Sequence, residues 1–219
     1  MEAIKHKRIT NKHYRKFLDT GEIDLVSEEK FIQALNNITK VRGHTVAEAR
    51  ALLITIYYTG CRPVEALNIT AKDINKSGHY ITIIIKGFKR GLPRTVYLSN
   101  KNKYVREIFK LSLNLFPDIF LFYHFRSNTN RIRQTQKGAV HYVEVSNKLK
   151  YHFKKWFTGV MSDSITPYYL RHNRFSKLAA AGATLEQLRL LKGSRTFESI
   201  TPYIHLSSAE AKKLARKIE

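Results

Sequence analysis

Apolar residues recur at helical spacing along most of the chain, and capping residues precede several of these runs. Ser27 precedes the first run, and Thr45-Val-Ala-Glu48 has the pattern of a capping box for a second helix ending at Gly60. Further helices are expected from Pro63, at 101–116, from Ser146 to Phe157, from Thr166 to Gly182, and after capping boxes that begin at Thr184 and Ser207. The chain is therefore predicted to be mainly helical.

One short part of the chain has the pattern of β-structure instead. Residues 80–86 and 94–98 are rich in β-branched and apolar residues, and the glycine-containing stretch 87–93 separates them. Two such runs predict an antiparallel hairpin. The expected fold class is therefore α+β, a mainly α-helical domain with a small antiparallel β-sheet. Residues 117–145 mix aromatic and basic residues, and their pattern assigns no element.

The domain organisation follows from length and from the absence of linkers. A chain of 219 residues suits one large domain with a short extension. Residues 1–24 are rich in Lys, Arg and His and poor in apolar residues, which predicts a basic N-terminal arm, either solvated or in contact with a partner. No repeat or low-complexity tract interrupts residues 25–219, so we expect a single domain there.

The charge of the chain points to a polyanionic partner. Lys and Arg number 39 against 17 Asp and Glu, a formal net charge of +22, which favours nucleic acid. No uncharged apolar run approaches the roughly 18 residues of a membrane span, and the basic start lacks the pattern of a signal peptide. We expect a cytoplasmic protein without membrane contact.

Metal and disulfide chemistry find little support in the sequence. Cys61 is the single cysteine, so neither an internal disulfide nor a cysteine-built zinc site is possible. The nine His residues are scattered, with no ligand-like spacing beside a third suitable residue. We therefore expect no metal and no cofactor.

Three segments carry a resemblance to a known family. Tyr-Thr-Gly-Cys-Arg62-Pro-Val-Glu65 resembles the first arginine box of the tyrosine recombinases, the phage integrase family. Thr-Pro-Tyr168-Tyr-Leu-Arg171-His172 is similar to the second box, and Ile-Thr-Pro-Tyr203-Ile-His-Leu to the nucleophile segment. The matches follow the family's order along most of the chain, although each box alone is a weak motif.

The predicted hairpin fits the same resemblance. Ile-Ile-Ile-Lys86-Gly-Phe-Lys89-Arg90 looks like the family's strand and turn, whose lysine enters the minor groove at the cleavage site, and Arg94-Thr-Val-Tyr-Leu98 looks like the returning strand. The resemblance implies that Lys86 is the catalytic lysine, with Lys89 as the alternative. It also implies that Lys89, Arg90 and Arg94 contact DNA.

The resemblance implies a site-specific DNA recombinase or integrase acting through a 3′-phosphotyrosyl intermediate, without metal or ATP. Its partners are double-stranded DNA and further copies of the chain, assembled as a dimer or tetramer on that DNA. The family's catalytic positions fall on the following residues: Arg62, Lys86, Tyr168, Arg171, Ser194 and Tyr203.

The chemistry explains why these residue types are needed. Attack on a phosphodiester concentrates negative charge on its non-bridging oxygens, which planar bidentate cations such as Arg62 and Arg171 stabilise. A phenol titrates near ~10, so Tyr203 attacks only when its proton is accepted or its phenolate stabilised. The leaving 5′-oxygen needs a proton, which Lys86 can supply as a general acid. Glu65 is expected to orient an arginine, because it lies three residues from Arg62 on a helix.

Two positions depart from the family, because Tyr168 stands where His is usual and Ser194 where His or Trp is usual. Both are hydrogen-bond donors, but a phenol is a poorer proton shuttle than an imidazole. Tyr168 can instead be a packing residue. The resemblance gives His172 a supporting role, and it gives His205 no firm one.

The sequence leaves rival functions open. A type IB topoisomerase or hairpin-forming resolvase uses similar chemistry, and a catalytically decayed DNA-binding protein fits the two departures. Relatives usually carry a helical DNA-binding domain ahead of the catalytic one, so the chain is either a minimal recombinase or a fragment. The composition brings to mind integrases of archaea and their viruses. The apolar stripe after residue 207 covers either the chain's own domain or a neighbouring copy.

Overall fold

The structure is a computed structural model that describes residues 25–39, 45–88, 91–126, 131–135, 138–142, 147–161, 165–200 and 203. The helices are α2 (Glu28–Asn36), α3 (Val46–Thr59), α4 (Pro63–Leu67), α5 (Lys103–Leu113), α6 (Asn147–Trp156), α7 (Pro167–Ala180) and α8 (Leu185–Lys192), with single turns η1 (Ala71–Asp73) and η2 (Tyr123–Phe125). The strands are β1 (Ile74–Ser77), β2 (Tyr80–Ile85), β3 (Arg94–Ser99), β4 (Arg131–Thr135) and β5 (Gly138–Tyr142). The predicted fold class, mainly α-helical with a small antiparallel sheet, is confirmed.

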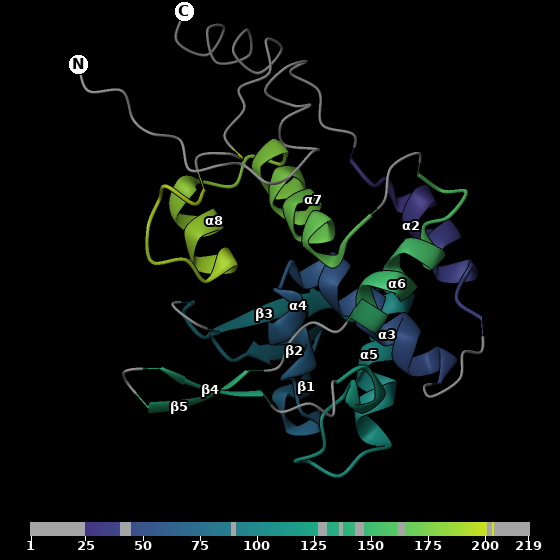
Figure 1. Cartoon of the computed structure of the whole chain (residues 1–219). Helices are drawn as coiled ribbons and strands as arrows, with labels where there is room; N and C mark the ends of the chain where they lie inside the picture. The colour runs from purple at the N-terminus through teal and green to yellow at the C-terminus, as the bar shows by residue number, and fades with distance from the viewer. Residues whose placement is uncertain are drawn as a thin grey trace, which may run out of the picture.

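Helix α3 forms the centre of the main core. Ten of its 14 residues are buried, as expected for a helix that is apolar over most of its surface. It packs against α5 on one side and α7 on another, and α4 follows directly from its end (Figure 1). The elements that carry the candidate site therefore start from one buried helix.

The three-stranded sheet has the order β1-β2-β3, and all its pairs are antiparallel. Ile81, Ile83 and Ile85 point into the core, while the residues between them face outward, which is the alternation expected of a half-buried strand. The predicted hairpin is confirmed as β2 and β3. Strand β1 was not predicted, because its sequence Ile-Asn-Lys-Ser is short and polar and is paired only as an edge strand.

The helix boundaries follow the caps with one correction. Ser27, Thr45, Thr166 and Thr184 each accept a backbone hydrogen bond at the start of their helices. The prediction of a full capping box at Thr45 is wrong, because only the bond from the Glu48 N–H to the Thr45 side chain forms. The buried carboxylate of Glu48 instead accepts from the backbone N–H of His124 at 2.9 Å and lies 2.6 Å from its Nδ1, which holds η2 against α3.

The region that the sequence left unassigned contains η2 and the β4-β5 hairpin. Residues 1–24, Ser146 and the predicted helix after Ser207 lie outside the described residues, so the expectations for the basic arm and the last helix stay predictions. Helix α7 ends at Ala180, just before the Gly182 predicted from the sequence.

A second, smaller core lies between α7 and α8. Its buried residues are Phe175, Leu188, Ile200 and Tyr203, and they form a cluster separate from the main core. Phe175 belongs to α7 and Leu188 to α8, while the other two lie on the segment after α8. This small core fixes the position of Tyr203 relative to α7.

Candidate active site

Arg62 is held at the start of α4 by Glu65. Helix α3 ends at Gly60 in the left-handed conformation, and Arg62 is the N-cap of α4. The Glu65 carboxylate accepts from the backbone N–H of Arg62 at 2.8 Å and from its Nη1 at 2.8 Å. The same carboxylate therefore fixes the main chain and the side chain of Arg62, which meets the expectation that Glu65 orients an arginine.

The buried Glu65 also meets two further arginines. Arg94 Nη2 donates to Oε2 at 2.9 Å, and Arg171 Nη1 lies 3.7 Å from the same oxygen. Burial alone would raise the pKa of Glu65, but the hydrogen bond and charge of Arg94, with help from Arg62 and Arg171, lower it overall. One carboxylate among three guanidinium groups leaves an excess of positive charge, which suits an anionic ligand.

Arg171 connects three segments. Its Nη1 donates to the carbonyl of Gly60 at 2.6 Å, and its Nη2 donates to the carbonyl of Lys192 at 2.8 Å. The side chain is buried, and burial, together with the charge of Arg62, lowers its pKa to about 10. The guanidinium therefore keeps its charge at neutral pH while it ties the ends of α3 and α8 to α7.

The connection between β2 and β3 packs onto this cluster. A Cβ on Gly91 would lie 2.8 Å from Arg62 Nη1, so the backbone there touches the guanidinium. The N–H of Leu92 donates to the carbonyl of Gly193 at 2.9 Å, just after α8. Gly193 has φ 65°, and a Cβ there would meet the Leu92 carbonyl at 2.7 Å, so this approach requires glycine.

Arg94 lies inside the arginine cluster. Only 6% of its side chain is exposed, and its Nε and Nη1 have no hydrogen-bond partner among the described residues. The sequence suggested a DNA contact without predicting this burial. Lys89 and Arg90, the other two suggested contacts, lie outside the described residues.

Lys86 follows β2 and is tied to η1. Its side chain is 51% exposed, and Nζ lies 2.8 Å from Oδ2 of Asp73. The same oxygen accepts from the N–H and hydroxyl of Thr70. Burial tends to raise the pKa of Asp73, but the hydrogen bonds from Lys86 and Thr70 lower it overall. Within the described part of the chain, Asp73 is the only ion-pair partner of Lys86.

Tyr203 is buried beside His172. Its ring is 4% exposed, and its hydroxyl oxygen lies 2.8 Å from Nδ1 of His172, within hydrogen-bonding distance. The sequence gave His172 a supporting role only. Its place directly after Arg171 was the available signal, but the contact joins residues 31 positions apart, which no local pattern predicts.

Lys192 faces the Tyr203 ring from the end of α8. Its Nζ lies 4.6 Å from the ring centroid and donates a hydrogen bond to the carbonyl of Ser199. Burial, together with the charges of Arg171 and Arg62, lowers its pKa to about 7. Sequence reasoning gave Lys192 no role.

The two positions that depart from the family are not part of these contacts. Tyr168 is 45% exposed, whereas Arg171 on the same helix is buried, so the two side chains occupy different environments. The Ser194 hydroxyl lies 2.6 Å from that of Ser199 and donates to the carbonyl of Thr196 at 3.1 Å. The structure thus brings Arg62 and Arg171 together around Glu65 and places Tyr203 beside His172, the residue after Arg171, while Lys86 and Tyr168 are more exposed.

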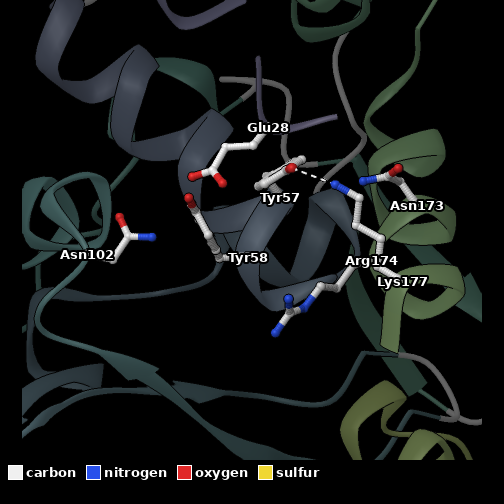
Figure 2. Close-up of a pocket in the computed structure, with 7 residues that line it drawn as sticks. All are labelled: Glu28, Tyr57, Tyr58, Asn102, Asn173, Arg174 and Lys177. Atoms are coloured by element: carbon white, nitrogen blue, oxygen red, sulfur yellow. Dashed lines mark hydrogen bonds between the residues drawn. The ribbon is translucent and has the colours of Figure 1, made fainter. Parts of the chain in front are cut away.

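A polar pocket lies elsewhere on α3 and α7 and contains none of the predicted site residues. Figure 2 shows the residues that line it: Glu28, Tyr57, Tyr58, Asn102, Asn173, Arg174 and Lys177. Lys177 Nζ donates to the hydroxyl of Tyr57 at 2.8 Å and to the carbonyl of Val26 at 2.6 Å. These bonds fasten the start of the described chain to α3 and α7.

The described residues contain neither a cluster of metal-ligating side chains nor a helix that could span a membrane. No three His, Cys, Asp or Glu side chains in that part of the chain gather as a possible set of metal ligands. No helix there has both the length and the apolar character needed to cross a bilayer.

Comparison with known proteins gives a family and a set of relatives. The model of the phage integrase family matches residues 26–210. Tyrosine recombinase XerC of Staphylococcus carnosus is 28% identical over 188 residues, 85% of this chain and 58% of that protein. XerC of Treponema denticola is 26% identical over 180 residues, 75% of this chain and 53% of that protein. The chain spans a little over half the length of these curated relatives.

Solved structures share the fold. XerH site-specific recombinase bound to difH substrate aligns with a TM-score of 0.61 and 22% identity, over 88% of this chain and 54% of that one. Tn1549 transposon integrase in complex with circular intermediate DNA aligns with a TM-score of 0.58 and 18% identity, over 89% of this chain and 67% of that one. The catalytic domain of bacteriophage HP1 integrase aligns with a TM-score of 0.52 and 17% identity, over 89% of this chain and 95% of that one.

Proposed function

Since this chain belongs to the phage integrase family, we propose that it is a tyrosine-type site-specific recombinase that cleaves and rejoins DNA through a 3′-phosphotyrosyl bond at Tyr203. The observation that carries the proposal is the position of Arg171. Its guanidinium approaches Glu65, the partner of Arg62, and also bonds the carbonyl of Lys192. A phosphate held by the arginines would therefore lie close to the segment that contains the tyrosine.

The proposed reaction uses the excess charge of the arginine cluster. Arg62 and Arg171 bind the non-bridging oxygens of the scissile phosphate, and the unpaired N–H groups of Arg94 add donors nearby. Tyr203 attacks the phosphorus, and Lys86 gives a proton to the departing 5′-oxygen. The phosphotyrosyl bond conserves the energy of the phosphodiester, so a 5′-hydroxyl can reverse the step without ATP.

The proposed partner is duplex DNA, bound by several copies of the chain. The net charge of +22 favours a polyanion. The XerH structure contains its difH substrate, and the Tn1549 integrase structure contains circular intermediate DNA. We expect Lys86, Lys89 and Arg90 to face the minor groove at the cleavage site, and dimers or tetramers to form on the DNA. The proposal concerns the matched part of the relatives, because the chain spans only part of their length.

A trapping experiment tests the proposal. Duplexes that bind the protein are recovered from a randomised pool, nicked near each candidate cleavage position, and incubated with the protein in EDTA. We expect a covalent protein–DNA band on a denaturing gel, lost in Tyr203→Phe but kept in Tyr80→Phe, an exposed tyrosine of β2. Salt-sensitive binding with no band from any substrate contradicts the proposal and favours a DNA-binding protein without catalysis.

The same preparation separates recombination from topoisomerase activity. A recombinase joins strands only at its recovered site, whereas a topoisomerase relaxes supercoiled plasmids that lack it. We expect no relaxation of a plasmid without the site. Relaxation of such a plasmid that depends on Tyr203 would keep the nucleophile but replace the proposed outcome.

A further inference from the structure

The nucleophile is already paired with a base in this structure. Tyr203 Oη lies 2.8 Å from Nδ1 of His172, and the two rings are tilted by 32° with centroids 5.6 Å apart. His172 lies on α7 directly after Arg171, so the imidazole and the guanidinium start from adjacent backbone positions. A general base must lie within hydrogen-bonding distance of the proton that it accepts, and His172 meets this condition.

The position where the family usually has a histidine does not supply such a base. Tyr168 occupies it, with a side chain that is 45% exposed. A phenol at neutral pH is protonated, so it can donate a hydrogen bond but cannot accept a proton from another phenol. Ser194 at the other departing position bonds Ser199 and Thr196. The proton of Tyr203 therefore needs another acceptor.

We propose that His172 is the general base of the cleavage step, accepting the Tyr203 proton on Nδ1. The neutral imidazole carries its own proton on Nε2. As the Oη–H bond breaks and Nδ1–H forms, Oη bonds to phosphorus. The bond from phosphorus to the 5′-oxygen breaks with its electron pair on that oxygen, which takes the proton of Lys86. In the reverse step Tyr203 leaves and recovers its proton from His172.

The charged groups around the pair favour this transfer. Lys192 Nζ lies 4.6 Å from the centroid of the Tyr203 ring, and the charges of Arg171 and Tyr203 interact. Positive charge near a phenol stabilises its phenolate and disfavours a protonated imidazole beside it. Arg171, and Lys192 when it is protonated, therefore favour the phenolate that forms when Tyr203 gives its proton to His172.

This inference rests on the proposed function, and its test uses the same nicked duplexes. The rate of covalent adduct formation is measured from pH 5 to 9 for the parent, His172→Asn and His172→Ala. The control is His79→Asn, at an exposed histidine in the turn between β1 and β2. Circular dichroism and DNA binding establish that each variant is folded.

We expect His172→Asn to form adduct about 100- to 10,000-fold more slowly at neutral pH. The parent rate should rise with pH and level off once imidazole is neutral, whereas the variant rate keeps rising towards the titration of a phenol. Added imidazole should speed His172→Ala but not the parent or His79→Asn. A purely structural role for His172 would slow the reaction equally at every pH and give no rescue.

The outcomes separate the inference from the function on which it rests. If Tyr203→Phe abolishes the adduct while His172→Asn keeps the parent rate and pH profile, only this inference is overturned. No adduct from the parent protein overturns both. Should the His172 variants not fold, the ¹⁵N shift of Nδ1 is compared between the parent and Tyr203→Phe. An unchanged shift contradicts the hydrogen bond between Tyr203 and His172, and with it the role of His172 as general base.

Discussion

The candidate site has two sides that are built differently. The arginine side consists of Arg62, Glu65, Arg94 and Arg171, and the tyrosine side of His172, Lys192 and Tyr203. The arginine side is organised by one buried carboxylate and by the backbone carbonyl of Gly60 just after α3, next to the main core. The tyrosine side rests on the small second core, on the hydrogen bond from Lys192 to Ser199 and on the contact between Tyr203 and His172.

This difference matches the two tasks of the proposed reaction. Groups that stabilise developing charge act best when they are fixed before the substrate arrives. The tyrosine carries the reacting oxygen, and its packing in the small core and its contact with His172 set where that oxygen lies. The following four variants test the contrast, from the largest expected effect to the smallest.

Replacing Glu65 should disrupt the arginine side most. Glu65→Gln leaves three guanidinium groups without their shared carboxylate, and we expect a loss of about 3–5 kcal/mol in the free energy of unfolding. Urea denaturation measures it. Glu107→Gln is the matched control, because the Glu107 pair with Arg50 is partly exposed and should contribute less than about 1 kcal/mol. Equal losses in the two variants would mean that the buried Glu65 carboxylate stabilises the chain no more than a partly exposed ion pair does.

Truncating Leu188 should loosen the tyrosine side alone. Leu188→Ala opens the small core, and we expect the opening free energy of α8, measured by hydrogen exchange, to fall by about 2–3 kcal/mol. The amides of α3 should exchange as before. Leu53→Ala in the main core is the comparison, and it should lower global stability by about 3–5 kcal/mol. Faster exchange of α3 in Leu188→Ala would mean that the two cores open together.

Lys192→Met should stabilise the chain near neutral pH. The folded-state pKa of Lys192 is lowered to about 7 from 10.5, so between these values the unfolded chain binds more protons and stability rises with pH. Met carries no charge, so the variant should gain about 1–2 kcal/mol near pH 7, a gain that shrinks towards pH 10. Denaturation at several pH values measures it. Lys150→Met, at an exposed position of α6, is the control.

Asp73→Asn should have the smallest effect on stability and distinguishes the two candidate lysines. The variant removes the charge that holds Lys86, while an amide oxygen can still accept from Thr70 at this buried position, so stability should fall by about 1 kcal/mol. If Lys86 is the general acid, adduct formation falls about tenfold, and a substrate with sulfur as the leaving atom, which needs no proton, restores it. Asp118→Asn, in the exposed pair with Lys72, is the control. An unchanged rate in Asp73→Asn favours Lys89.

The sequence predicts features that depend on neighbouring residues. The caps at Ser27, Thr45 and Thr184, the hairpin of β2 and β3, and the pairing of Glu65 with Arg62 all follow from spacings of a few positions. Contacts between distant segments gave no such signal. The bond from His124 to Glu48 and the approach of Lys192 to Tyr203 depend on how the elements pack.

The burial of Arg94 illustrates the same limit. Along a strand, alternation indicates which residues face the core. It does not indicate that Arg94 meets the carboxylate of Glu65 from α4. The family motif identifies the arginines by their order in the chain. Their common dependence on one glutamate becomes visible only when the distances are known.

The partners of Arg171 bear on how this site tolerates sequence drift. Two of its N–H groups bond the main-chain carbonyls of Gly60 and Lys192. Every amino acid supplies a carbonyl, so the side chain at position 192 can change without loss of that contact. The same holds for Ser194, whose backbone N–H continues the end of α8 whatever its side chain is. The anchoring of Arg171 therefore constrains the path of the main chain around α8, while the side chains at the end of α8 can be substituted without loss of these bonds.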